Sequence, residues 1–96
     1  MAVKKRFVIV RTYSAGVFAG YLKSRKGQEV ILTDAIRVWY WKGAHNLSSL
    51  AVIGTTAPTE CKFGIPVPVI ELTQAIEVID TTKEGQKSIQ GVTPCK

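Results

Sequence analysis

The sequence contains one histidine, His45, and two cysteines, Cys61 and Cys95, which lie 34 residues apart. A structural zinc site usually takes four Cys or His ligands in closely spaced pairs. This chain has too few such residues, and none of them are paired. We therefore expect no metal site, no cofactor and two reduced thiols.

The chain also lacks a recognisable catalytic constellation. It has no Gly-x-Ser-x-Gly motif and no neighbouring Cys and His, and its carboxylates, among them Asp34, Glu60, Glu71, Glu77, Asp80 and Glu84, are scattered along the chain. Catalysis needs a positioned base or nucleophile. Asp34 with His45 is the one pair to consider, but a lone His beside a helix start is more often a surface or capping residue. We predict that the protein is not an enzyme.

Long apolar runs are missing as well. The longest uninterrupted run is only a few residues, which is too short to span a bilayer. The basic start Met-Ala-Val-Lys-Lys-Arg has no apolar segment of signal-peptide length after it. We expect a cytoplasmic protein with no membrane contact.

Basic charge, in contrast, is plentiful. Thirteen Lys and Arg against seven Asp and Glu give a net charge of +6, and seven of the cations lie in the first 26 residues: Lys4, Lys5, Arg6, Arg11, Lys23, Arg25 and Lys26. Such a chain attracts anions, whether nucleic acid, a nucleotide or an acidic protein surface. The alternative is that these residues form the solvated rim of a strand pair.

The length of 96 residues and the 46% apolar content fit a single domain over residues 1–96. The pattern of β-branched and aromatic residues predicts an α+β fold: a small antiparallel sheet of about five strands, sandwich-like or barrel-like, with two short helices. We expect strands at 5–13, 16–23, 29–41, 69–72 and 75–79, helices within 43–54 and 81–89, and a Pro-rich loop at 55–68.

Capping residues mark both helices. Asn46 or Ser48 can cap the first helix and Gly54 can end it, while the second is expected to begin near Thr82 and to be weakened by Gly85. The pattern Leu-Thr-x-Ala-Ile-x-Val occurs at 32–38 and again at 72–78. It indicates either two pseudo-symmetric units or simply two kinked strands.

The segment Arg37-Val38-Trp39-Tyr40-Trp41 is the first candidate site. Strand alternation places Arg37, Trp39 and Trp41 on one face with Thr33 and Ala35, and Leu32, Ile36, Val38 and Tyr40 on the core face. An indole can stack on a planar base, and an arginine can bind a phosphate. The alternative is that both tryptophans pack beneath the helix that follows.

A second candidate is the segment 11–17, which the pattern places at a hairpin. Arg11, Tyr13, Ser14 and Gly16 supply a cation, a ring, a hydroxyl and an unobstructed backbone within six positions, as a ligand with phosphate or ribose would require. A plain hairpin is the alternative. Asn46 and Ser48 complete the predicted ligand-binding residues.

Several segments together resemble a family of small, functionally uncharacterised proteins encoded by tailed bacteriophages and prophages. They are RTYSAGVFAGYL at 11–22, DAxRxWYWxGAxxLSxLA at 34–51, Cys61-Lys62-Phe63, and ELTxAIEVI at 71–79 with Ser88-Ile89. Ile36, His45 and the ending Thr93-Pro94-Cys95 depart from the family pattern. The resemblance implies an accessory protein in the host bacterial cytoplasm and supplies no activity.

These observations lead to one functional prediction and two alternatives. The first is an anti-defence sponge that binds and sequesters a small anionic nucleotide-derived signal, with its site between the subunits of a homo-oligomer. The second is sequence-independent nucleic-acid binding through Lys4-Lys5-Arg6, Arg25-Lys26 and the two tryptophans. The third is a structural or host-protein-binding module that uses the aromatic patch.

Overall fold

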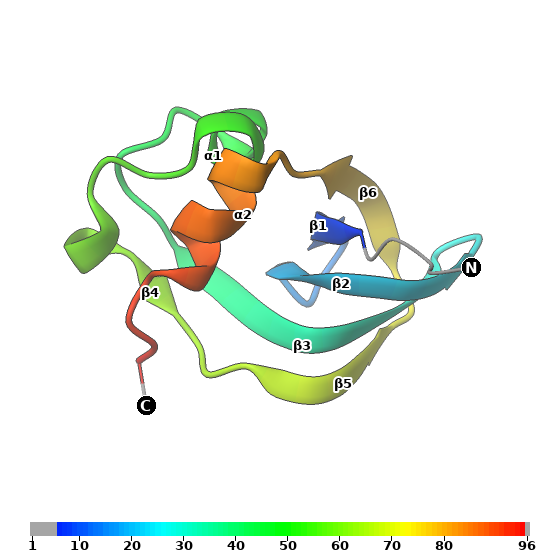
Figure 1. Cartoon of the computed structure of the whole chain (residues 1–96). Helices are drawn as coiled ribbons and strands as arrows, with labels where there is room; N and C mark the ends of the chain where they lie inside the picture. Colours follow the sequence, from blue (N-terminus) through cyan, green and yellow to red (C-terminus); the bar gives the residue numbers. More distant parts are fainter. Residues whose placement is uncertain (1–5, 96) are drawn as a thin grey trace, which may run out of the picture.

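The computed structural model describes residues 6–95, which form an α+β domain with an open antiparallel sheet (Figure 1). The strands are β1 (Phe7–Thr12), β2 (Val17–Lys26), β3 (Glu29–Tyr40), β4 (Lys62–Phe63), β5 (Val67–Leu72) and β6 (Ala75–Asp80), and the helices are α1 (Leu47–Ile53), α2 (Lys83–Gln90) and the 3₁₀ turn Pro58–Glu60. The predicted fold class is confirmed.

The sheet runs in the order β4-β3-β2-β1-β6, and β5 also pairs with β3. Along the same edge of β3, β4 pairs near Val38 and Tyr40, whereas β5 pairs between Val30 and Ala35. The structure has one strand more than the five expected from the sequence. This additional strand is β4, which lies within the expected loop at 55–68.

A bulge bends β3 in its middle. Opposite Gly20, the pairing of β2 with β3 shifts register, and Asp34 has a left-handed backbone with φ of 48°. Gly20 is closely approached here, because a Cβ at this position would lie 3.1 Å from the Ala35 Cα. An added residue of this kind bends a strand and increases its twist.

The curved sheet separates two hydrophobic cores. One lies on the face that carries α1 and α2 and includes Phe7, Ile9, Val38, Leu50, Phe63 and Ile89; the other includes Val8, Val10, Phe18, Val30, Leu32 and Leu72. Both faces of β1 are therefore covered, which explains why Phe7–Val10 is a continuous apolar run in the sequence.

The bulge also overturns part of the predicted alternation. Leu32 packs in one core with Ala35, whereas Ile36 and Val38 pack in the other, because Asp34 adds a residue to the pleat. The prediction that Leu32 shares a face with Val38 is wrong. Tyr40, also predicted to be core, is 47% exposed, since it ends β3 after a register shift against β4.

The helix caps follow the sequence closely. The Asn46 side chain accepts a hydrogen bond from the Ser49 N–H at 2.9 Å, and Gly54 ends α1 with a φ of 78°. The Thr82 hydroxyl oxygen accepts from the Gly85 N–H at 3.0 Å at the start of α2. None of the helices in residues 6–95 is long and apolar enough to cross a membrane.

The repeated Leu-Thr-x-Ala-Ile-x-Val pattern marks two kinks. Its third position is Asp34 in the bulge of β3 and Gln74 between β5 and β6. The alanines that follow, Ala35 and Ala75, pack in the same core.

Candidate functional site

The two predicted ligand-binding segments meet in the structure. In the pairing of β2 with β3, Phe18 lies opposite Arg37, so the turn between β1 and β2 lies beside the Arg37 side chain. The Arg37 guanidinium Nη1 donates a hydrogen bond to the Ala15 carbonyl oxygen in that turn at 3.1 Å. Arg37 therefore connects the hairpin to the aromatic end of β3.

A groove of about 300 Å³ lies at this junction and is called here the Arg37–Trp39 groove. Its lining comes from β2, β3 and β5 and includes Phe18, Ala35, Arg37, Trp39, Val67 and Ile70. Gly64, Ile65 and Cys95 complete it. Most of this lining is apolar, and among the described residues that line the groove only Arg37 is charged.

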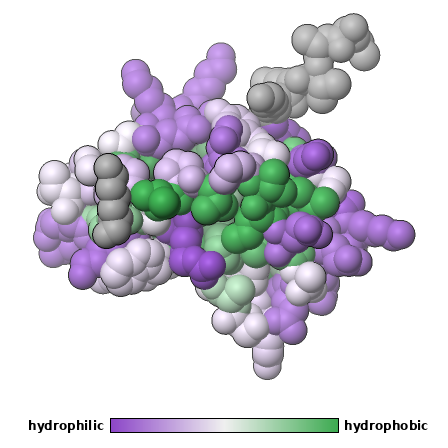
Figure 2. Space-filling model, turned by 90° about the horizontal axis from the view of Figure 1, so that it is seen from below, coloured by the Kyte–Doolittle hydropathy of each residue, from purple (hydrophilic) through white to green (hydrophobic). Residues whose placement is uncertain are grey.

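Apolar side chains continue beyond the groove. Ile65 and Val69 are each more than half exposed. Seen from below, the side on which β5 lies in Figure 1, the molecule shows a band of apolar residues with polar residues around it (Figure 2).

The Arg37 guanidinium lies over an aromatic ring and has no carboxylate partner in the described part of the chain. Its guanidinium carbon lies 4.6 Å from the centroid of the buried Phe18 ring. None of the carboxylates described in residues 6–95 forms an ion pair with it. A planar guanidinium held in this way can use its remaining N–H groups to bind an anion.

Trp39 provides a flat surface next to this charge. Its side chain is 57% exposed, and it lies two residues from Arg37 on β3, which places both on the same side of the strand. The Lys62 ammonium lies 5.3 Å from the Trp39 ring centroid. The groove thus combines a cation, an indole and apolar walls.

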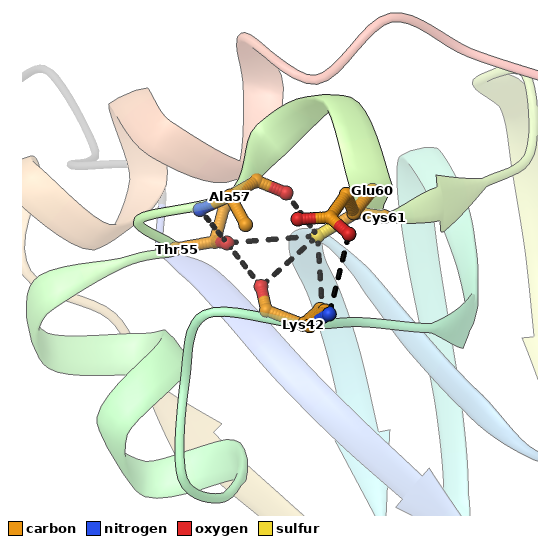
Figure 3. Close-up of polar contacts among 5 residues, drawn as sticks. All are labelled: Lys42, Thr55, Ala57, Glu60 and Cys61. Carbon is orange, nitrogen blue, oxygen red and sulfur yellow. Dashed lines mark hydrogen bonds and ion pairs between the residues drawn. The ribbon is translucent and has the colours of Figure 1, made fainter.

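A cluster of loop contacts fixes the residues just before β4 (Figure 3). The buried Cys61 sulfur lies 3.5 Å from both the backbone nitrogen and oxygen of Lys42, and 3.6 Å from the Thr55 hydroxyl and the Ala57 carbonyl oxygen. The Lys42 ammonium also pairs with Glu60 at 3.2 Å. These contacts position β4, and with it Lys62.

Three other predicted residues of the hairpin stabilise or border the turn. The Ser14 hydroxyl donates to the Gln74 side-chain oxygen at 2.6 Å, and Gly16 has the predicted left-handed backbone, with φ of 99°. Tyr13 is 78% exposed beside them. None of the three lines the Arg37–Trp39 groove.

The remaining predicted residues lie elsewhere. Arg11 forms an ion pair with Glu77 of β6 at 3.3 Å. Trp41 is half buried against the core beneath the helices, as in the alternative interpretation of this residue. Asn46 caps α1, and Ser48 is exposed on that helix.

Sequence reasoning missed the apolar half of the groove. Phe18, Val67 and Ile70 resemble ordinary strand residues, and only the sheet pairing brings them beside Arg37. Cys95 enters because its N–H donates to the Phe63 carbonyl oxygen at 2.8 Å. For Lys62, the one available signal was its place in the segment Cys61-Lys62-Phe63.

The described members of the two basic clusters do not line the groove. Lys4 and Lys5 lie outside the described residues, and Arg6 pairs with Asp80 at 2.7 Å. Arg25 and Lys26 lie at the opposite end of β2 from Val17 and Phe18.

Comparison with known proteins gives one match. Residues 5–89 match the model of a family described as a domain of unknown function (DUF6948). No curated protein and no solved structure matches the chain. The description of the family names neither an activity nor a source.

Proposed function

The chain belongs to the DUF6948 family, and we propose that it is a binding protein that holds a small nucleotide-type anion, with a planar ring, in the Arg37–Trp39 groove. One observation carries this proposal: the Arg37 guanidinium, which pairs with no carboxylate in residues 6–95, lies over the Phe18 ring in the same groove as the exposed Trp39.

The groove offers each part of such a ligand a separate partner. A nucleobase would stack on the Trp39 indole or against the apolar wall of Val67 and Ile70. A phosphate would accept hydrogen bonds from the free edge of the Arg37 guanidinium. The groove volume is at the lower end for ligand sites, roughly 300–1,000 Å³, so the ring and its nearest phosphate would fill it.

Three larger hollows lack this combination. One, of about 400 Å³, includes Arg25 but no aromatic side chain. Two others are larger still. One, of about 440 Å³, lies on α2 and is lined by Lys83, Gln86, Lys87, Gln90 and Gly91, with no aromatic side chain. The other, of about 500 Å³, is lined by His45 and its neighbours and includes no lysine or arginine. Volume alone would favour these hollows, but a charged ring compound needs a cation and an aromatic surface together.

The proposed activity is binding without chemical change of the ligand. If the protein acts in a phage-infected cell, as the sequence resemblance implies, binding would sequester a nucleotide signal and so oppose host defence. A homo-oligomer would allow a second copy to cover the exposed side of the groove.

Fluorescence titration tests the proposal, because the exposed Trp39 lines the site. We expect nucleotides to change the tryptophan emission in a saturable way, and Arg37→Met to weaken binding at least tenfold. Arg25→Met is the matched control, since Arg25 is also exposed and also donates to one backbone carbonyl, that of Gly27. Equal binding by both variants, or no binding by the wild type, would exclude the groove as a nucleotide site.

Nucleic-acid binding is the second candidate, because a lysine over an exposed tryptophan also suits single-stranded chains. Its signature is a steep loss of affinity with added salt, as several phosphate contacts are broken. A short oligonucleotide that binds far more tightly than any mononucleotide, with this salt dependence, would favour it.

A further inference from the structure

Resting on the proposed function, we infer that the groove selects ligands with two phosphate groups over those with one, and that Lys62 provides the second phosphate contact. The ligand class is then a nucleoside diphosphate or a dinucleotide. The observation behind this inference is that two cations lie close to Trp39: Arg37 is two residues before it on β3, and the Lys62 ammonium lies 5.3 Å from its ring centroid.

The register of the sheet sets this arrangement. Arg37 precedes Trp39 by two residues on β3, a separation of about 7 Å along a strand. Lys62 pairs with Tyr40, one residue beyond Trp39. The order along the strand is therefore cation, indole, cation.

Lys62 is free to contribute its charge. Its side chain is exposed, and none of the carboxylates in the described part of the chain pairs with it. In contrast, Lys42, the nearest lysine before it in the chain, is paired with Glu60. The contact between the Lys62 ammonium and the Trp39 ring is weak at an exposed site, so a phosphate can draw the ammonium away.

The backbone of Lys62 is nevertheless fixed. The Cys61 contacts hold the residue before it, and the β4 pairing with Tyr40 holds Lys62 itself. A second phosphate would therefore meet an ammonium whose backbone is held by the pairing of β4 with β3. An exposed charge contact of this kind changes affinity by up to about fivefold.

The experiment measures dissociation constants at fixed ionic strength for nucleosides, nucleoside monophosphates and nucleoside diphosphates of adenine and guanine, and for the cyclic dinucleotides of both bases. We expect the wild type to bind one of the two-phosphate classes about two- to fivefold more tightly than the monophosphate. The diphosphates and the cyclic dinucleotides show whether the two phosphates must be adjacent or separated.

Three variants assign that preference. Lys62→Gln should remove the advantage of the second phosphate and leave monophosphate binding unchanged, Lys62→Arg should preserve it, and the exposed Lys23→Gln should have no effect. Circular dichroism and thermal midpoints show whether each variant is folded. If Lys62→Gln is not folded, the dissociation constants of the Lys62→Arg protein are measured with added salt, which screens the charge at this position instead of removing it.

The outcomes separate this inference from the proposed function. Equal wild-type affinity for one and two phosphates, or an equal loss for both in Lys62→Gln, overturns the role of Lys62 while Arg37-dependent binding stands. Absence of any Arg37-dependent nucleotide binding overturns both.

Discussion

Replacing Gly85 by alanine sets helix propensity against packing. Gly85 lies inside α2, where alanine stabilises a helix by about 1 kcal/mol relative to glycine. Judged from the sequence, Gly85→Ala should therefore stabilise the protein. The structure predicts the opposite, because Gly85 is buried against the backbone of α1.

The size of the clash decides whether Gly85→Ala raises or lowers the stability of the protein. A Cβ on Gly85 would lie 1.9 Å from the Ala51 carbonyl oxygen, whereas real Cβ atoms essentially never approach closer than 3.0 Å. Moving α2 away would strain two hydrogen bonds to α1, from the Thr82 N–H to Ala51 O at 3.0 Å and from the Thr82 hydroxyl to Val52 O at 2.6 Å. Overpacking costs roughly 1–3 kcal/mol and each lost hydrogen bond about 1 kcal/mol.

Overpacking of about 2 kcal/mol and the loss of one of the two hydrogen bonds, about 1 kcal/mol, outweigh the helix-propensity gain of about 1 kcal/mol. We therefore expect Gly85→Ala to lower the free energy of unfolding by about 2 kcal/mol. For a domain of this size that corresponds to a drop of about 10 °C in the thermal midpoint. Urea denaturation and a thermal scan by circular dichroism measure both quantities.

Gly91→Ala is the matched control, because Gly91 ends the same helix, is exposed and has a right-handed backbone with φ of −84°. Its stability should stay within about 0.5 kcal/mol of the wild type, as at most surface positions. A Gly85→Ala protein as stable as this control, or more stable than the wild type, would refute the close contact between α1 and α2.

Three further predictions follow from single residues. Asp34 has a left-handed backbone at the bulge, so Asp34→Gly should preserve or raise the thermal midpoint and Asp34→Val should lower stability by about 1–2 kcal/mol; equal midpoints would contradict the bulge. Cys95 is exposed and Cys61 is buried, so a thiol reagent should modify only Cys95 in the native protein, as mass spectrometry of labelled peptides would show. Because Cys95 lines the Arg37–Trp39 groove, a bound nucleotide should slow that reaction. Trp39→Phe should remove most of the acrylamide-quenchable fluorescence, whereas an unchanged quenching constant would place Trp39 in the interior.

The candidate site was half predictable from the sequence. Arg37 and Trp39 could be selected because alternation in a strand places residues i and i+2 on one face. The same rule predicts that Trp41 lies on the face of Arg37 and Trp39. However, β3 ends at Tyr40, and Trp41, which follows the strand, packs against the core. The rule holds only as far as the strand does.

Partners across the sheet were beyond sequence reasoning. Phe18 supports the Arg37 guanidinium and Lys62 lies over Trp39, yet these residues are separated from their partners in the chain and meet only through strand pairing. A short strand such as β4, with two residues, has no hydrophobic period to reveal it.

Local chemistry was determined by the sequence itself: the strand and helix segments, the Asn46 and Thr82 caps, and the turn glycines all depend on interactions within a few residues. Tertiary structure decided what depends on distant residues. By helix propensity alone, Gly85 only weakens α2. In the folded protein its missing side chain allows α2 to approach the backbone of α1 closely. The groove forms because β4 and β5 both pair with the same edge of β3, which brings a cation, an indole and an apolar wall from separate parts of the chain to one place.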